Sequence, residues 1–140
     1  MKSGVRKFCA VCLFAAAAAV CAQRFLSARQ PDAEAILLET DTEREAWLNL
    51  HGWRVSQPER TETRVPALFQ TSAGQAWLGL QHAQGLWPEQ FAGVSAVRYV
   101  YPVENTAQQE LYAELLLSAE GILIGAQVYS AETGLMQTVL

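Results

Sequence analysis

Residues 111–130 have the sequence LYAELLLSAEGILIGAQVYS, and this pattern predicts a β-hairpin. Apolar residues alternate along the first half, so that Leu111, Ala113, Leu115 and Leu117 lie on one face of a strand over 111–118. A tight connection over 119–121 follows, because Gly121 readily adopts the positive φ that such loops need. Residues 122–130 form the partner strand. The chain is therefore expected to contain an antiparallel sheet.

Two other segments have strand character. Residues 97–103 alternate in the same way, with Val97, Tyr99, Tyr101 and Val103 on one face. Residues 53–65 are extended, are interrupted by Pro58, and carry Glu59, Glu62 and Arg64. Charges and proline limit unwanted pairing at the border of a sheet, so we expect this segment to be an exposed edge strand.

A first helix begins at Thr40, because Thr40 and Glu43 have the spacing of a capping box. Ala46, Trp47 and Leu50 then form an apolar stripe at helical spacing. Gly52 is expected to end the helix, since glycine is favoured just after a helix C-terminus.

A second helix is expected over 68–82. Its apolar residues recur at the spacing of one buried face: Phe69, Ala73, Ala76, Trp77 and Leu80. Gly85 is the expected end of this helix, and residues 86–94 follow as a compact loop.

These elements predict an α+β fold, with a small antiparallel sheet of about four strands and two helices packed on one face, behind an N-terminal hydrophobic segment. The order lacks the β-α-β alternation of a nucleotide-binding parallel sheet. We divide the chain into a signal peptide or single membrane anchor over 1–26, a linker over 27–39 and an extracytoplasmic domain over 40–140. Residues 36–38 fit either a strand or an early turn of the first helix.

The N-terminal segment predicts export. Lys2, Arg6 and Lys7 precede an uncharged apolar run of 15 residues over 8–22. This length fits the hydrophobic region of a signal peptide better than a full span, and cleavage after Ala22 is one interpretation. Phe25 and Leu26 extend the apolar character, so we expect a single-pass membrane anchor through residues 8–22, with secretion after cleavage near Ala22 as the alternative. In both cases the positive-inside rule places the C-terminal domain outside the cytoplasmic membrane.

The three cysteines all lie within this run. Cys9 and Cys12 form a C-x-x-C, but no histidine or carboxylate lies nearby to complete a metal shell. Val20 fits poorly as the residue before a lipidated Cys21. We therefore interpret the cysteines as small apolar residues and expect neither a disulfide nor a metal in the exported part.

The charge balance argues against nucleic acid as a partner. From Phe25 onward, six arginines stand against all 14 acidic residues, a net charge of −8. A domain of this charge repels phosphate backbones and anionic headgroups, so we expect no nucleic-acid partner.

No catalytic, cofactor-binding or metal-binding residue is predicted. His51 and His82 lie at expected helix ends, where a histidine is favoured electrostatically. Gln81 to Gln84 is the polar cluster to examine first. Pairs of acidic residues, Glu43 with Glu45 and Glu114 with Glu120, fit solvated surface positions. The aromatic residues fit the core of a small domain, with a binding surface as the alternative: Trp47, Trp53, Trp77, Trp87, Tyr99 and Tyr101.

An ordered series of segments resembles a bacterial family known as domain of unknown function 4830. The series is GWRV (52–55), VPALF (65–69), LQHAQGL (80–86), FAGVSAVRYVYPVEN (91–105), the hairpin 111–130 and GLM (134–136). The resemblance covers about residues 40–140. It implies a folded extracytoplasmic domain behind a membrane segment, and no activity. The sequence departs from the family pattern at Thr106, Ala126 and Gln127.

The expected function is a non-enzymatic binding or interaction module of the bacterial cell envelope, anchored in the membrane or secreted. It needs no cofactor, and its partner is an unidentified protein or envelope component. The alternatives are a cell-envelope hydrolase with an unrecognised site and a sensory ectodomain that works through its membrane segment.

Overall fold

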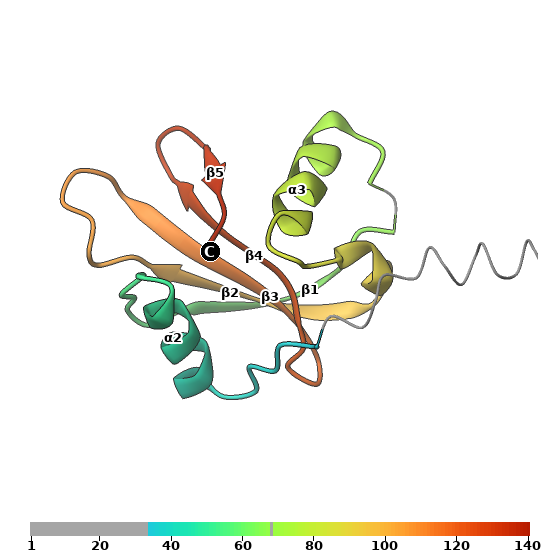
Figure 1. Cartoon of the computed structure of the whole chain (residues 1–140), viewed down its shortest axis with the longest axis horizontal. Helices are drawn as coiled ribbons and strands as arrows, with labels where there is room; N and C mark the ends of the chain where they lie inside the picture. The colour runs from blue at the N-terminus through green and yellow to red at the C-terminus, as the bar shows by residue number, and fades with distance from the viewer. Residues whose placement is uncertain (1–33, 68) are drawn as a thin grey trace, which may run out of the picture. The chain divides into compact units, whose positions relative to one another are not determined.

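The computed structural model describes residues 34–67 and 69–140 of the chain (Figure 1). Residues 35–140 form one compact unit. The expected signal or anchor segment, its cleavage site and the three cysteines all lie outside the described residues. Within those ranges no helix combines the length and the apolar character needed to cross a membrane.

The centre of this unit is a five-stranded antiparallel sheet in which neighbours in sequence are neighbours in space. Its strands are β1 (Glu59–Arg64), β2 (Ser95–Pro102), β3 (Leu111–Ser118), β4 (Leu123–Ser130) and β5 (Met136–Gln137). Two helices, α2 (Asp41–Leu50) and α3 (Ser72–His82), and the short 3-10 helix η1 (Pro88–Phe91) complete the unit (Figure 1). The predicted α+β class is confirmed. The short β5 is the strand that the sequence pattern did not reveal.

The hairpin of β3 and β4 forms as predicted. Leu111 lies opposite Ser130, and the register shifts between Leu116 and Leu117. Gly121 has a φ of +84°, and the Cα of Glu39 would lie 3.0 Å from a Cβ at this position. The connection therefore requires glycine both for its backbone conformation and for space.

The two helices contact opposite faces of the sheet, which differs from the prediction that both pack on one face. Leu115 and Leu117 of β3 belong to one apolar cluster with Leu48 of α2. Leu116, between them in sequence, belongs to a second cluster with Trp77 of α3. Successive side chains of a strand point to opposite faces, so α2 and α3 lie on different sides of β3. Below, "the α2 face" means the side that carries Leu115 and Leu117.

The capping box of α2 is confirmed, and of its predicted apolar stripe Trp47 packs against the core, whereas Ala46 and Leu50 do not. The Glu43 N–H donates to Thr40 Oγ1 at 3.2 Å, and the Thr40 N–H donates to Glu43 Oε2 at 2.9 Å. Ala46 is exposed and Leu50 is 79% exposed, whereas Arg44 and Leu48 are buried. Arg44 and Leu48 are four residues apart and therefore lie on the same side of the helix, which is the buried side of α2.

The second helix begins later than the predicted residue 68. Thr71 caps it, since its Oγ1 accepts the Gly74 N–H at 3.0 Å. Phe69 precedes the helix and stacks on Trp77 with ring centroids 5.9 Å apart. The buried residues of α3 are Leu78 and Gln81 rather than the predicted alanines.

The unit begins at Ala35, inside the segment expected to be a linker over 27–39. The Leu38 N–H donates to the Gly121 carbonyl at 2.8 Å, and Leu37 forms an isolated bridge with Ile122. Residues 36–38 are therefore extended and lie beside the β3–β4 connection.

Candidate functional site

A pocket of about 310 Å³ opens on the α2 face of the sheet, next to the start of α2. Its polar lining comes from Glu39, Arg44, Arg60 and Ser118, and Tyr99 and Leu117 contribute ring and aliphatic surface. Four parts of the chain meet there: the segment before α2, the first turn of α2, the neighbouring strands β1 and β2, and the end of β3 with its connection to β4. Only the tertiary fold brings these parts together.

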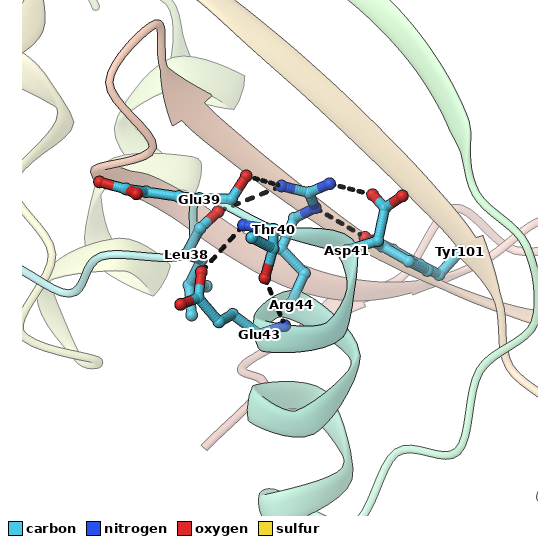
Figure 2. Close-up of polar contacts among 7 residues, drawn as sticks. All are labelled: Leu38, Glu39, Thr40, Asp41, Glu43, Arg44 and Tyr101. Carbon is cyan, nitrogen blue, oxygen red and sulfur yellow. Dashed lines mark hydrogen bonds and ion pairs between the residues drawn. The ribbon is translucent and has the colours of Figure 1, made fainter.

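Arg44 is the most constrained of these residues. Its Nε donates to the Tyr101 hydroxyl at 3.1 Å, and its Nη1 donates to the carbonyls of Leu38 and Glu39, each at 3.1 Å (Figure 2). Its Nη2 contacts the Asp41 carboxylate. The guanidinium therefore ties the first turn of α2 to the preceding segment and to β2.

Tyr99 adds an aromatic contact to this arrangement. The Arg44 guanidinium carbon lies 4.0 Å from the centroid of the Tyr99 ring, and the rings of Tyr99 and Tyr101 stack at 6.4 Å. A cation over a ring face is attracted by the ring quadrupole, most strongly where water is excluded. The side chain of Arg44 is only 5% exposed, so this attraction acts in a poorly hydrated place.

The contacts of Arg44 keep its charge in place. Burial alone would lower the pKa of Arg44, but the hydrogen bond to Tyr101 and the Asp41 carboxylate outweigh it and raise this pKa above its ordinary value. Burial raises the pKa of Tyr101, and Arg44 opposes part of that rise. Arg44 is therefore a permanent cation at the wall of the pocket, paired with a neutral phenol.

Local sequence positions this arginine. Thr40 and Glu43 fix the start of α2, and the bond from the Thr40 backbone N–H to Glu43 is the main cause that lowers the pKa of Glu43. Arg44 is one residue further on and its own N–H donates to the Thr40 carbonyl at 3.1 Å. The first helical turn thus directs the arginine side chain toward β2.

Arg60 is the second cation of the pocket, and it reaches the pocket from β1. It lies opposite Tyr99 in the β1–β2 register, so its side chain is on the α2 face. The side chain is 52% exposed, and its ion pair with Glu62 is long at 3.5 Å. Unlike Arg44, it is free to turn toward a bound molecule.

The two histidines do not line this pocket. His51 caps the C-terminus of α2 and makes an edge contact with Trp47, with ring centroids 4.6 Å apart. His82 lies in the last turn of α3, where its Nε2 is 2.6 Å from Glu89 Oε1 and its ring stacks on Trp87 at 4.0 Å. The structure therefore places them in two separate local contacts.

The side chains of Gln81 and Gln84 bind backbone groups of neighbouring segments and so have a structural role. Gln81 Oε1 accepts the Ala126 N–H at 2.8 Å, and Gln84 Nε2 donates to the Ala126 carbonyl at 2.8 Å. Gln84 Oε1 also accepts the Val139 N–H at 2.7 Å. The side chains of Gln81 and Gln84 therefore make the hydrogen bonds to β4 that a neighbouring strand would make. The Gln127 side chain is part of the same network, because its Oε1 accepts hydrogen bonds from Trp77 Nε1 and Gln81 Nε2.

The other predicted candidates also have structural partners. Trp47 and Trp53 pack against the apolar cluster of the α2 face, and the Trp53 Nε1 donates to the Val139 carbonyl at 2.9 Å. Glu114 pairs with Arg98 at 2.9 Å rather than with Glu120. Of the predicted aromatic residues, Tyr99 is the one that lines the pocket.

Sequence reasoning missed both arginines of the pocket. Arg44 stands in the charged stretch Asp41–Glu45, which has the composition of a solvated helix face. One signal pointed to its burial, since Arg44 precedes the apolar Leu48 by four residues and shares its side of the helix. Arg60 carried no such signal.

The described ranges hold no cluster of three or more histidine, cysteine, aspartate or glutamate residues placed to bind a metal ion. No family model, curated protein or solved structure matches this chain.

Proposed function

We propose that the folded unit is a non-enzymatic binding module and that the pocket beside Arg44 receives a small anionic group, such as a carboxylate or a phosphate. The observation that carries the proposal is that two guanidinium groups, of Arg44 and Arg60, line one small pocket in which Glu39 is the one lining carboxylate. The carboxylates that pair with the two arginines, Asp41 and Glu62, are exposed and do not line it. Guanidinium groups are well suited to carboxylate and phosphate oxygens, because their N–H donors form a planar fork.

The two arginines contribute to anion binding in different ways. Arg44 is held by its bonds to Tyr101, Leu38 and Glu39 and supplies a fixed positive charge. Arg60 is half-exposed and supplies donors that close on the ligand. The apolar side chains of Leu117 and Val97 limit hydration of the pocket, which strengthens both electrostatic contacts.

Anion binding can be tested by thermal unfolding of the full chain in detergent, with inorganic phosphate or acetate replacing chloride at constant ionic strength. A ligand that binds the folded state raises the midpoint of unfolding. We expect a rise for the wild type and for the control variant Arg54→Gln, whose exposed ion pair with Glu104 lies outside the pocket. Arg60→Gln should abolish the rise. An equal rise in Arg60→Gln would refute this site.

We also propose that this module is displayed outside the cytoplasmic membrane of a bacterial cell, either anchored through residues 8–22 or released after cleavage near Ala22. The support is the sequence of the N-terminal segment, with three positive charges before an apolar run. Fractionation of cells combined with N-terminal sequencing of the mature protein distinguishes the two forms. A chain found in the cytoplasm with its N-terminus intact would contradict both.

A further inference from the structure

β1 forms one edge of the sheet, and the part of the chain described by the structure places no strand on its outer side. All six of its residues are exposed. The Val65 N–H donates to the Val94 carbonyl at 2.9 Å, in the register that pairs β1 with β2. Bonded and non-bonded pairs alternate in an antiparallel ladder, so Arg60, Glu62 and Arg64 direct their backbone N–H and C=O groups to the open edge.

The side chains at this edge carry both signs of charge. Arg60 and Glu62 lie on the α2 face, and their side chains are 52% and 79% exposed. Their mutual ion pair, at 3.5 Å, is a surface contact of the kind that contributes little to stability. Each side chain is therefore available to an opposite charge on another molecule.

We propose that β1 is a dimerisation edge, where a second copy of this chain adds its own β1 in antiparallel orientation across a two-fold axis at Thr61. In this register Thr61 faces Thr61 of the second copy, and Arg60 faces Glu62 on both sides of the axis. Arg60 and Glu62 both present backbone groups to the edge, so each such pair closes its hydrogen bonds. Opposite charges directly across two strands add to the pairing.

Charge distinguishes this register from its neighbours. An axis at Glu62 would place Glu62 opposite itself and Arg60 opposite Arg64, and like charges in these positions are destabilising. An axis at Arg60 would place two arginines in contact. An axis at Thr63 pairs Glu62 with Arg64, but leaves only residues 62–64 of the strand in the ladder. The axis at Thr61 combines opposite charges with a longer overlap.

The axis of such a pair is perpendicular to the sheet, so the α2 faces of both copies lie on the same side. Arg60 belongs both to the edge and to the pocket wall, and each pocket therefore opens beside the interface. The dimer depends only on β1, and it stands whether or not the pocket binds an anion.

Cross-linking tests the register. In the full chain with Cys9, Cys12 and Cys21 replaced by alanine, Thr61→Cys would meet its own copy at the axis, with Cα atoms about 4.5 Å apart and within disulfide range. Thr63→Cys is the matched control, because this exposed residue has the same type and the same face but lies opposite Glu59 of the second copy. We expect oxidised dimers of the purified protein for Thr61→Cys and monomers for Thr63→Cys. Monomers for both variants, or equal dimers for both, would overturn the proposal.

Charge reversal tests the contacts. Arg60→Glu and Glu62→Arg each create like charges across the axis, and sedimentation should show dimer affinity lowered by at least about tenfold. A mixture of the two variants restores opposite charges, as does the double variant, so both should dimerise like the wild type. Arg54→Glu and Glu104→Arg, which alter another exposed ion pair, should leave the dimer unchanged. A wild type that stays monomeric at millimolar concentration, or a mixture that does not associate, would refute the dimer.

Discussion

Arg44 shows how a charged residue can be part of the interior of a small domain. Its side chain is 5% exposed, yet its donors reach the Tyr101 hydroxyl, two backbone carbonyls and the Asp41 carboxylate. A buried charge is tolerated only when such partners replace water. The arginine is thereby both a structural link and a wall of the pocket.

Replacing Arg44 by methionine keeps much of the side-chain volume but leaves the carbonyl of Leu38 and the hydroxyl of Tyr101 without this donor. We expect Arg44→Met to lower the free energy of unfolding by about 2–4 kcal/mol. Urea unfolding followed by tryptophan fluorescence measures this loss. The control Arg54→Met, at a side chain that is 68% exposed, should change stability by less than about 0.5 kcal/mol. Equal losses in the two variants would contradict the role of Arg44.

The raised pKa of the buried Tyr101 leads us to expect a loss of folding stability at alkaline pH. Burial raises its pKa in the folded state above the ordinary value of 10.0. The unfolded chain then releases this proton at a lower pH, so the contribution of Tyr101 is complete below about pH 10 and is lost as pH rises toward the folded pKa. The free energy of unfolding should fall over this range, and less steeply in Tyr101→Phe. An identical pH dependence for both proteins would exclude this contribution.

At the scale of the elements, glycines divide into those that α3 tolerates and those that the turns require. Gly79 lies inside α3 with ordinary φ, and a Cβ there would meet nothing within 4 Å. Gly121 has a φ of +84° and the Cα of Glu39 close to any Cβ. The two positions therefore respond in opposite ways to the same substitution.

We expect Gly79→Ala to raise the free energy of unfolding by about 0.5–1 kcal/mol, because alanine is the better helix former. Gly121→Ala should lower it by at least about 1 kcal/mol, because the residue is held at positive φ and is crowded. Thermal unfolding of the two variants beside the wild type measures both changes. A destabilised Gly79→Ala protein would contradict the open space at this position of α3.

The attachment of α3 to β4 depends on buried amides. Gln81 is fully buried and accepts the Ala126 N–H at 2.8 Å. Gln81→Met removes this acceptor and leaves a buried donor unpaired, which should cost about 1–3 kcal/mol. The exposed Gln90 is the matched control, and Gln90→Met should be close to neutral. Hydrogen exchange of the Ala126 amide would speed up only in Gln81→Met.

At the scale of the whole folded unit, β3 joins the two apolar clusters. Leu117 belongs to the cluster on the α2 face and Leu116 to the cluster that contains Trp77 of α3. Because one strand contributes to both, we expect the loss of either cluster to destabilise the other. Residues 35–140 should therefore unfold in one cooperative transition.

Leu117→Ala should lower the free energy of unfolding by about 2–5 kcal/mol, since a fully buried leucine leaves a cavity. Leu116→Ala should lower the same transition, by a smaller amount because Leu116 is 9% exposed. Calorimetry should find a single unfolding peak in both variants. Two separate peaks in either variant would show that the clusters are independent.

The local sequence pattern was sufficient to predict most of the strands and turns. The alternation in β3, the capping box at Thr40 and the charged edge strand β1 were all predicted from residues close together in sequence. Each of these features follows from the chemistry of a few neighbours: the two-residue period of a strand, one cap, or one positive φ. The five strands and two helices that result confirm the α+β class.

Contacts between residues far apart in sequence decided which polar side chains are buried and what they bind. The partner of Arg44 is Tyr101, 57 residues later, and the partner of Gln81 is the backbone of Ala126, 45 residues later. The helical period places Arg44 on the side of Leu48, but it does not show that an arginine or a glutamine is buried, because burial of a polar group depends on the partners that the fold brings to it. The sequence by itself therefore determined the helices, four of the strands and the edge position of β1, because these follow from local periodicity and caps. The tertiary structure alone decided the short β5, which face each helix covers and where the pocket lies, because these depend on contacts between distant residues.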